Sequence, residues 1–215
     1  MKRAWIIANG VLEKPGLLKK RMMGDDWIVA VDGGLGHIRR MDLSPDLVIG
    51  DLDSIQPEDK YWLDSSAVEI IQYPESKDQT DLELALHEAQ KRGYRTILIL
   101  AALGGRLDHE LANIFLLSSS AFIDFDIRIL DYEKEIFFIY SAATIQGNSG
   151  DIVSLIPLGR EVKGITTENL AYPLNNGTLY PDQARGISNT MTADKARVTV
   201  KEGRLICVHF FKIES

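Results

Sequence analysis

The chain has 215 residues, and its 24 Lys and Arg against 31 Asp and Glu give a formal net charge of −7 at pH 7. Its 45% of hydrophobic residues exclude a largely disordered protein, and its acidic balance argues against nucleic-acid binding. The single cysteine, Cys207, excludes an intrachain disulfide, and no apolar run is long enough to span a membrane, so we predict a soluble cytoplasmic protein.

Short β-rich runs and helical patterns alternate along residues 1–133. We predict strands at Ala4–Ala8, Trp27–Val31, Leu47–Ile49, Glu69–Tyr73, Thr96–Leu100 and Asp126–Leu130. The clearest helical pattern is Thr80–Arg92, where Thr80 and Glu83 form a capping box, and a second helix is expected from about Leu107 to Ser120. Such alternation predicts an α/β domain with a mainly parallel sheet covered by helices.

The pattern changes over residues 134–215, where helical periodicity is absent and turn signals separate short apolar runs. We predict strands at Asp151–Ile156, Ala196–Lys201 and Leu205–Phe211, the last of which contains Cys207 as an inert core residue. Strands of this spacing are typical of an antiparallel sandwich or barrel. The sequence therefore predicts two domains, 1–133 and 134–215, the second of them all-β.

Four predicted strands are followed by loops rich in acids and glycines. Because the carboxyl ends of parallel strands meet at one edge of a sheet, these loops are expected to converge there. They contain Val31-Asp32-Gly33-Gly34, Gly50-Asp51-Leu52-Asp53-Ser54, Ser76-Lys77-Asp78-Gln79-Thr80-Asp81 and Gly104-Gly105-Arg106-Leu107-Asp108-His109.

Carboxylates gathered this closely repel one another unless cations compensate, and Mg²⁺ is a hard cation that prefers oxygen ligands. The pairs Gly33-Gly34 and Gly104-Gly105 allow backbone N–H groups to approach an anion. Lys77 and Arg106 are placed to bind phosphate oxygens. Together these features predict a metal–nucleotide site.

Each loop also has a structural explanation. Asp81 and Asp108 suit the first turn of a helix without any chemistry, and Asp32-Gly33-Gly34 suits a turn. The two acids of Gly50-Asp51-Leu52-Asp53-Ser54 are harder to explain in that way. The chain has no Gly-rich Lys-Ser/Thr phosphate loop and no complete dinucleotide fingerprint, and its histidines lack zinc-ligand spacing, with His37 and His87 expected at the surface.

These motifs, in this order, resemble the thiamine pyrophosphokinase family, most closely its bacterial members. The resemblance is carried by the four loops above, with the continuation Leu82-Glu83-Leu84-Ala85-Leu86, by Asn113, and by Arg185-Gly186-Ile187-Ser188-Asn189. It extends over nearly the whole chain. Two positions depart from the pattern, because many members have Phe where this chain has Leu52 and an aromatic residue where it has Gln79.

The resemblance implies a nucleotide-binding catalytic α/β domain and a β-sandwich domain for thiamine binding and dimerisation. It also implies a homodimer with thiamine in a cleft shared by two subunits, and transfer of a pyrophosphoryl group from ATP to the thiamine hydroxyl, which yields thiamine diphosphate and AMP. Mg²⁺ is the expected cofactor.

Residue roles follow from the resemblance as hypotheses. We assign Mg²⁺ to Asp51, Asp53 and Asp81, with Lys77 and Arg106 stabilising charge on the reacting phosphates. Either Asp81 or Asp78 orients or deprotonates the alcohol. The nucleotide is expected to contact Asp32, Gly33, Gly34, Gly104, Gly105, Asp108, His109 and Asn113. Thiamine is expected to contact Asp81, Tyr172, Ser188 and Asn189.

Other functions stay open at this point. A pyrophosphokinase acting on a pterin alcohol would share the scaffold and differ in the C-terminal domain. A nucleotide-binding regulator would not need so many carboxylates, and a metal-dependent phosphohydrolase would not need thiamine. A purely structural protein is least compatible with the acidic loops.

Overall fold

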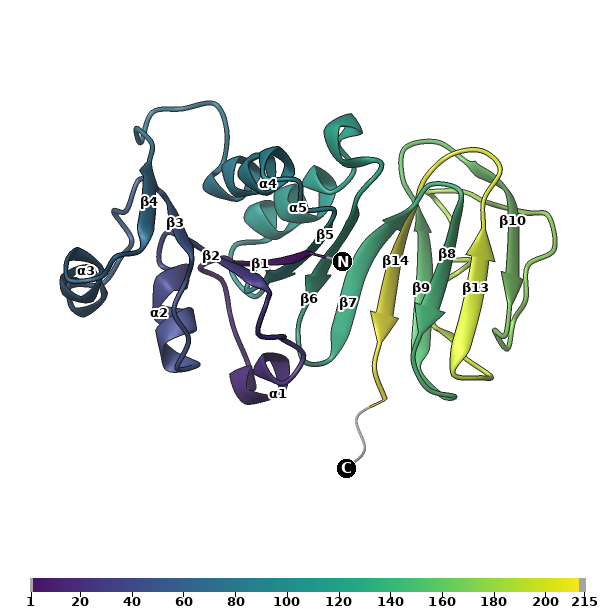
Figure 1. Cartoon of the computed structure of the whole chain (residues 1–215). Coiled ribbons are helices and arrows are strands. Elements are labelled where there is room, and N and C mark those ends of the chain that lie inside the picture. Colours follow the sequence, from purple (N-terminus) through teal and green to yellow (C-terminus); the bar gives the residue numbers. More distant parts are fainter. Residues whose placement is uncertain (1, 213–215) are drawn as a thin grey trace. The chain divides into compact units, whose positions relative to one another are not determined.

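The computed structural model describes residues 2–212, and the chain divides into two compact units (Figure 1). The first runs to Tyr132 and the second begins at Glu133, one residue from the sequence-based boundary. None of the helices within residues 2–212 combines the length and the apolar character that crossing a membrane requires.

The first unit is built on a parallel sheet in the order β6-β5-β1-β2-β3-β4. Its strands are β1 (Arg3–Ile7), β2 (Trp27–Val31), β3 (Leu47–Gly50), β4 (Glu69–Gln72), β5 (Thr96–Leu100) and β6 (Asp126–Leu130). The residues of β3 are all buried, as expected for a strand covered on both faces, whereas the edge strand β4 is largely exposed. All six strands lie within about one residue of the predicted bounds.

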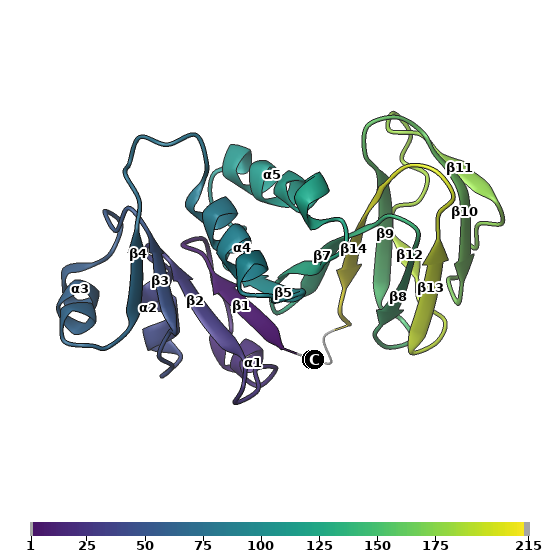
Figure 2. The same cartoon turned by 45° about the horizontal axis from the view of Figure 1, so that its top comes forward.

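Helices cover both faces of this sheet. The helices are α1 (Pro15–Lys19), α2 (Gly34–Arg40), α3 (Pro57–Asp64), α4 (Asp81–Lys91), α5 (Leu107–Leu116) and the 3₁₀ turn η1 (Ser120–Phe122). Figures 1 and 2 show α4 and α5 on one face, with α1 and α2 on the other. The sequence predicted α4 and α5 but missed the three shorter helices, whose periodic patterns span only one or two turns.

Helix α4 begins as the sequence predicts, with one difference. Thr80 Oγ1 accepts a hydrogen bond from the Glu83 amide at 3.2 Å, so Thr80 is the N-cap. The Glu83 carboxylate accepts its hydrogen bond from the Gln79 side chain at 3.3 Å instead of reaching back to Thr80. Only one half of the capping box therefore forms, and it still fixes the start of the helix beside the acidic loops.

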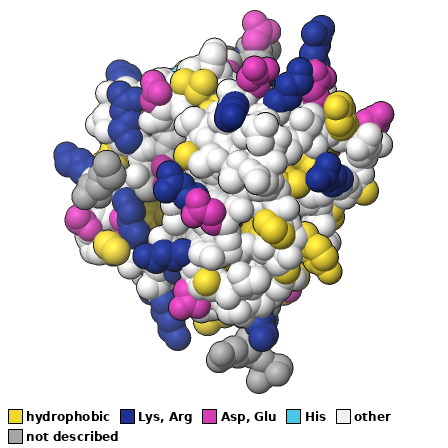
Figure 3. Space-filling view, turned by 90° about the vertical axis from the view of Figure 1, so that its right-hand side faces the viewer, with side chains coloured by type: hydrophobic (Ala, Val, Ile, Leu, Met, Phe, Trp, Pro, Cys, Tyr) yellow, Lys and Arg dark blue, Asp and Glu magenta, His cyan; other side chains and the backbone are white. Residues whose placement is uncertain are grey.

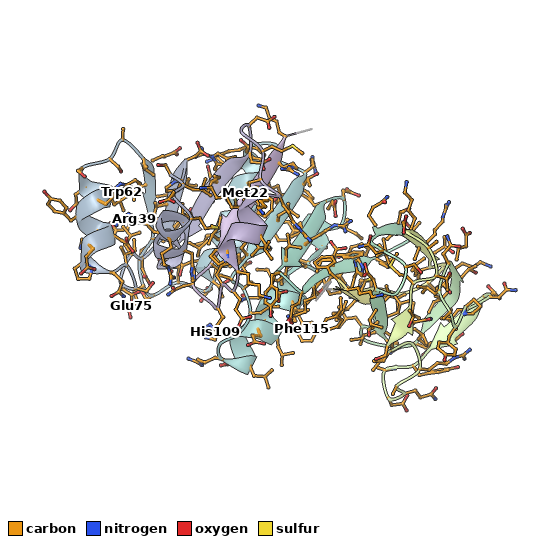
Figure 4. The ribbon with its side chains drawn as sticks, turned by 90° about the horizontal axis from the view of Figure 1, so that it is seen from below. Met22, Arg39, Trp62, Glu75, His109 and Phe115 are labelled. Carbon is orange, nitrogen blue, oxygen red and sulfur yellow. The ribbon has the colours of Figure 1, made fainter. Side chains whose placement is uncertain are left out.

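Helix α3 is held beside α2 by Arg39. Its guanidinium pairs with Asp59 and lies over the Trp62 ring, 5.4 Å from the ring centre, and Figure 4 shows the two side chains together. The histidine on α2 differs from expectation, because His37 is buried. One of its ring nitrogens lies 2.8 Å from the Gly10 carbonyl oxygen and the other 2.7 Å from Arg40, so the neutral ring joins α2 to the segment after β1.

The second unit contains two antiparallel sheets, in the orders β12-β9-β14-β7 and β11-β10-β13-β8. The strands are β7 (Lys134–Ile139), β8 (Ala142–Gln146), β9 (Ile152–Pro157), β10 (Val162–Glu168), β11 (Gly177–Leu179), β12 (Asn189–Thr190), β13 (Lys195–Thr199) and β14 (Leu205–Phe210). Side chains from both sheets, including Cys207, pack into one hydrophobic core. The sequence predicted β9, β13 and β14 and missed the other strands.

A buried cluster of three ionisable side chains lies within the first of these sheets. The two ring nitrogens of His209 each lie 3.0 Å from a carboxylate oxygen, one of Glu135 and one of Asp151. Asp151 also accepts hydrogen bonds from the amides of Asn148 and Lys212. These bonds connect β7, β14 and the residues that precede β9.

Candidate active site

The strand order of the first unit reverses between β1 and β5, which lie side by side although β2, β3 and β4 separate them in sequence. Such a switch point opens a crevice at the carboxyl ends of the strands. A cavity of about 680 Å³ lies there. It is lined by residues that follow β1, β2, β3 and β5 and by the first turns of α4 and α5.

Most of the predicted acids meet at this cavity. Its lining includes Asp32, Asp51, Asp53, Asp81, Asp108, Arg106, His109 and Asn113. Lys77 is not part of this lining, but it contacts Asp81, which is. Asp78 is not brought to the cavity: it is exposed and makes no hydrogen bond or ion pair within residues 2–212.

Asp32 faces the other carboxylates from the end of β2. Its Oδ1 accepts a hydrogen bond from the Leu52 amide at 3.2 Å. The side chain fits there because residue 50 is glycine, where a Cβ would clash with Asp32 Oδ1. Burial and the nearby charges of Asp81 and Asp51 raise the pKa of Asp32 to about 7.

The second acidic loop presents two carboxylates close together. Asp51 Oδ1 accepts a hydrogen bond from the Asp53 amide at 3.1 Å, and Leu52 between them has a positive φ of 68°. The side chain of Asp51 raises the pKa of Asp53. This turn holds the two carboxylates close together, and such a concentration of negative charge favours a bound cation.

Lys77 is the cation that pairs with Asp81 in this cluster. Its Nζ lies 2.6 Å from Asp81 Oδ1, an oxygen that is buried and has no well-directed hydrogen bond within the described chain. Partial burial lowers the pKa of Lys77, but the contact with Asp81 and the charges of Asp51 and Asp32 outweigh it and raise the pKa. Lys77 is therefore a fixed positive charge beside the acids.

The first glycine pair is used differently from the prediction. The Gly33 amide donates to Ser54 Oγ at 3.0 Å, and Gly34 is buried outside the cavity lining. A Cβ at Gly34 would clash with the Ile7 carbonyl oxygen, so this glycine allows α2 to pack closely against β1. The Gly33 amide thus already has a side-chain partner, and Gly34 serves close packing.

The second glycine pair also has a protein partner. The amides of Gly104 and Gly105 both donate to Glu110 Oε1, at 2.9 and 2.8 Å. Arg106, which follows them, makes two hydrogen bonds to the exposed carboxylate of Asp108, at 3.1 and 2.6 Å. The loop thus carries an anion site that an internal carboxylate already fills.

The remaining predicted nucleotide residues lie on α5. His109 lines the cavity, and Figure 4 shows it on this helix. Asn113 donates to the Ala102 carbonyl oxygen at 2.8 Å, so its side chain ties α5 to the chain that leaves β5. The sequence placed both residues near the nucleotide, and the structure places both on the same wall.

The second unit has a cavity of its own, of about 290 Å³. Tyr172 and Asn189 line it, together with Leu155, Thr167 and residues 184–187. Ser188, which was expected to contact thiamine, does not line this cavity. Its amide donates to Ser154 Oγ at 3.0 Å. Figure 3 shows the face of the molecule that lies at the right in Figure 1, where hydrophobic side chains form separate patches among basic and acidic ones.

Both units match profiles of one known protein family. A family profile described as "Thiamin pyrophosphokinase, catalytic domain" matches residues 18–129, and one described as "Thiamin pyrophosphokinase, vitamin B1 binding domain" matches residues 143–205. Thiamine pyrophosphokinase from Bacillus subtilis is 30% identical over 184 residues, which cover 85% of this chain and 86% of that protein.

The chain belongs to the thiamine pyrophosphokinase family. It is thus an enzyme of the ATP-dependent diphosphotransferase class, of bacterial type. The crystal structure of thiamine pyrophosphokinase from Bacillus subtilis superposes with a TM-score of 0.88 and 27% identity, covering 99% of this chain and 100% of that one. The enzyme from Geobacillus thermodenitrificans superposes with a TM-score of 0.84 and 26% identity, covering 98% of each chain.

The two cavities fall in different matched regions of the thiamine pyrophosphokinase family. The acidic cavity lies within the first unit, most of which the catalytic-domain profile matches, and the smaller cavity lies within the vitamin B1 binding region. Sequence reasoning missed Asn9, Gly10, Ser54 and Glu110 in the acidic cavity. Asn9 and Gly10 follow β1, so the same strand-end rule that found Asp32 would have found them.

The acidic cavity also bears on the expected cation. Within residues 2–212, no group of three or more acidic, histidine or cysteine side chains is arranged closely enough to hold a metal ion. The donors are nevertheless carboxylate oxygens, which a hard cation prefers. Asp81 Oδ1 is buried beside Lys77, and burial together with nearby negative charges raises the pKa of Asp32.

Proposed function

We propose that this enzyme transfers the pyrophosphoryl group of ATP to the hydroxyl of thiamine, giving thiamine diphosphate and AMP. The observation that carries the proposal is the acidic cavity at the switch point, where Lys77 contacts Asp81 beside two further carboxylates. Family membership supports the choice of substrates.

The reaction is an in-line displacement at the β-phosphorus. The thiamine oxygen forms a bond to that phosphorus as its bond to the bridging oxygen of AMP breaks, and the hydroxyl proton passes to a base. We assign this base role to Asp81 in preference to Asp78. Asp81 lines the cavity, whereas Asp78 is exposed outside it.

The cations of the protein stabilise charge on the phosphates. Lys77 is held beside Asp81 and neutralises charge that develops on the transferring group. Arg106 is exposed and paired with Asp108, so it must leave this partner to bind a phosphate. We expect His109 and Asn113, on the same wall, to lie near the nucleotide.

Mg²⁺ is the proposed cofactor, with Asp51 and Asp53 as its protein ligands, because Asp81, the third ligand expected from the sequence, is assigned here as the base. These residues offer carboxylate oxygens that lack another cation apart from Lys77 within the described chain. When bound, Mg²⁺ would neutralise phosphate charge and help to orient the triphosphate.

Thiamine carries a positive charge on its thiazolium ring, so an aromatic face and an acidic neighbourhood both attract it. The cavity of the second unit supports this part of the proposal, because Tyr172 lines it and exposes 75% of its surface. We place thiamine in this cavity, with its rings against Tyr172.

We further propose that the protein acts in the cytoplasm as a homodimer whose subunits share the thiamine cleft. Support comes from an exposed apolar stripe on α5 formed by Leu107, Leu111 and Phe115, which are 69%, 43% and 44% exposed. Figure 4 shows Phe115 on this helix. Stripes of this kind commonly mark protein contacts. A Phe115→Glu variant that stays dimeric in sedimentation analysis would place the interface elsewhere.

The role of Asp51 provides the test of the catalytic proposal. Asp51→Asn keeps the size of the side chain and removes its charge, so we expect kcat to fall by about 10²-fold or more without loss of fold. Asp64→Asn is the matched control, because Asp64 is exposed at the end of α3. An Asp51→Asn enzyme with turnover near that of the control would refute the assignment.

A further inference from the structure

The wall of the smaller cavity includes a short segment, Tyr172-Pro173-Leu174, that is fixed at both ends. At one end the Tyr172 backbone binds the Asn189 side chain. At the other end the Leu174 amide donates to Thr167 Oγ1 at 2.8 Å, and the Thr167 amide donates to the Leu174 carbonyl oxygen at 2.9 Å. Pro173 between them restricts the backbone further.

Asn189 binds this segment in the manner of a neighbouring strand. Its Nδ2 donates to the Tyr172 carbonyl oxygen at 2.7 Å, and its Oδ1 accepts from the Tyr172 amide at 3.0 Å. One residue further, the Ala171 amide donates to the Thr190 carbonyl oxygen at 2.9 Å, and Leu170 pairs with Met191. The Asn189 side chain thus extends this antiparallel pairing to Tyr172, beyond the last backbone bond.

The hydrogen-bonding capacity of Asn189 is largely used by these contacts. Its Oδ1 also accepts from the Thr190 amide at 2.9 Å, so both acceptor positions of that oxygen are occupied. One N–H of the amide remains for any ligand. The Tyr172 ring, in contrast, is 75% exposed on a backbone that cannot move freely.

We propose that Asn189 is a positioning residue, which acts on thiamine by holding Tyr172 in place and not as a direct ligand. This inference deepens the proposed function and rests on it, because it takes the cavity as the thiamine site. A fixed aromatic face binds a flat ligand without the cost of ordering the chain at the moment of binding. The inference differs from the sequence-based expectation that Asn189 contacts thiamine.

A double-mutant cycle tests this proposal, with thiamine binding to the full chain measured by calorimetry and ATP binding measured separately. We expect Asn189→Ala to raise the thiamine Kd about 5-fold, the effect of losing a net hydrogen bond, and to leave the ATP Kd unchanged. In the Tyr172→Ala background the same substitution is expected to change the thiamine Kd less than about 2-fold, because its target is absent.

Two further variants make the result specific. Asn189→Gln keeps both groups of the amide on a longer side chain and adds no charge, so we expect an intermediate thiamine Kd. Asn175→Ala is the control, since Asn175 is exposed nearby and its side chain makes no hydrogen bond within residues 2–212. Thermal unfolding of each variant verifies the fold, and Asn189→Gln replaces Asn189→Ala in the cycle if the latter does not fold.

The outcomes separate this proposal from the proposed function. If Asn189→Ala raises the thiamine Kd by the same factor in the wild-type and Tyr172→Ala proteins, Asn189 is a direct ligand and the positioning role is overturned. An Asn189→Ala protein with the wild-type thiamine Kd would overturn it as well. A wild-type chain that binds ATP but no thiamine would instead show that the proposed function itself has failed.

Discussion

The Lys77 ammonium lies 2.6 Å from the Asp81 carboxylate, four residues further along the chain at the start of α4. The contact places one cation beside a cluster of acids in which burial, together with the charges of Asp81 and Asp51, raises the pKa of Asp32 to about 7. The carboxylates of this cavity supply the negative charge that attracts a cation, and Lys77 supplies the positive charge that attracts a phosphate. Lys77 therefore neutralises part of the charge of these acids, and in the proposed function it also stabilises the transferring phosphates.

Removal of this cation should impair chemistry more than thiamine binding. For Lys77→Ala we expect kcat to fall by about 10²-fold, the usual effect of losing a charged group that stabilises the transition state, with a small change in the thiamine KM. Steady-state kinetics measures both. The control is Lys91→Ala on the exposed part of α4, where the side chain is 78% exposed. Equal activities of the two variants would remove Lys77 from the catalytic account.

The Glu110 carboxylate holds the Gly104–Gly105 loop through both amides. Glu110→Ala leaves these donors without their acceptor, and we expect the ATP KM to rise about 5-fold while the thiamine KM stays constant. Glu110→Gln keeps an acceptor oxygen and should behave nearly as the wild type. If Glu110→Ala lowers the ATP KM instead, the amides bind phosphate and Glu110 competes with it.

Acid should destabilise the first unit through Asp26. This carboxylate accepts hydrogen bonds from Arg3 Nε and Nη2, Trp5 Nε1 and the Met23 amide, at 2.6–2.8 Å, and its side chain is 2% exposed. Burial raises the pKa of Asp26, but these hydrogen bonds outweigh burial and hold the pKa below its ordinary value. The stability that Asp26 supplies is therefore present above the unfolded pKa of about 3.9 and is lost as the pH falls through the lower folded value.

Asp26→Asn should consequently reduce the free energy of unfolding by about 2–3 kcal/mol at pH 7, with a difference from the wild type that shrinks in acid below about pH 4. Urea denaturation across this range measures it. Asp25→Asn, at the exposed neighbouring position, should have little effect. A difference between Asp26→Asn and wild type that grows in acid would contradict the account.

The acidic half of the site was predictable because one rule governs it. Residues that follow parallel strands meet at one edge, so Asp32, Asp51 and Asp53 were found from their chain positions alone. The rule did not hold for Asp78, because the segment between β4 and α4 is long enough to keep that side chain away from the edge of the sheet. It was also not applied to Asn9 after β1.

Hydrogen-bond partners were not predictable in this way. A glycine pair indicates backbone amides that can approach an acceptor closely, but nothing in the sequence indicates that Ser54 or Glu110 is that acceptor. The same limit applies to Asn189, whose residue type fits a ligand contact and a backbone clamp equally well. Among the missed strands of the second unit, β11 and β12 have only three and two residues, and β10 has a register shift at Gly164, so their periodicity is weak. Strands β7 and β8 are as long as those that were predicted.

Product analysis tests the central claim most directly. The full chain is mixed with ATP, Mg²⁺ and thiamine, and nucleotides and thiamine species are separated by chromatography. We predict AMP and thiamine diphosphate in equal amounts, with formation of both dependent on thiamine and on the metal. ADP with thiamine monophosphate, which would mean attack at the γ-phosphorus, or the absence of any phosphorylated thiamine, would contradict the account.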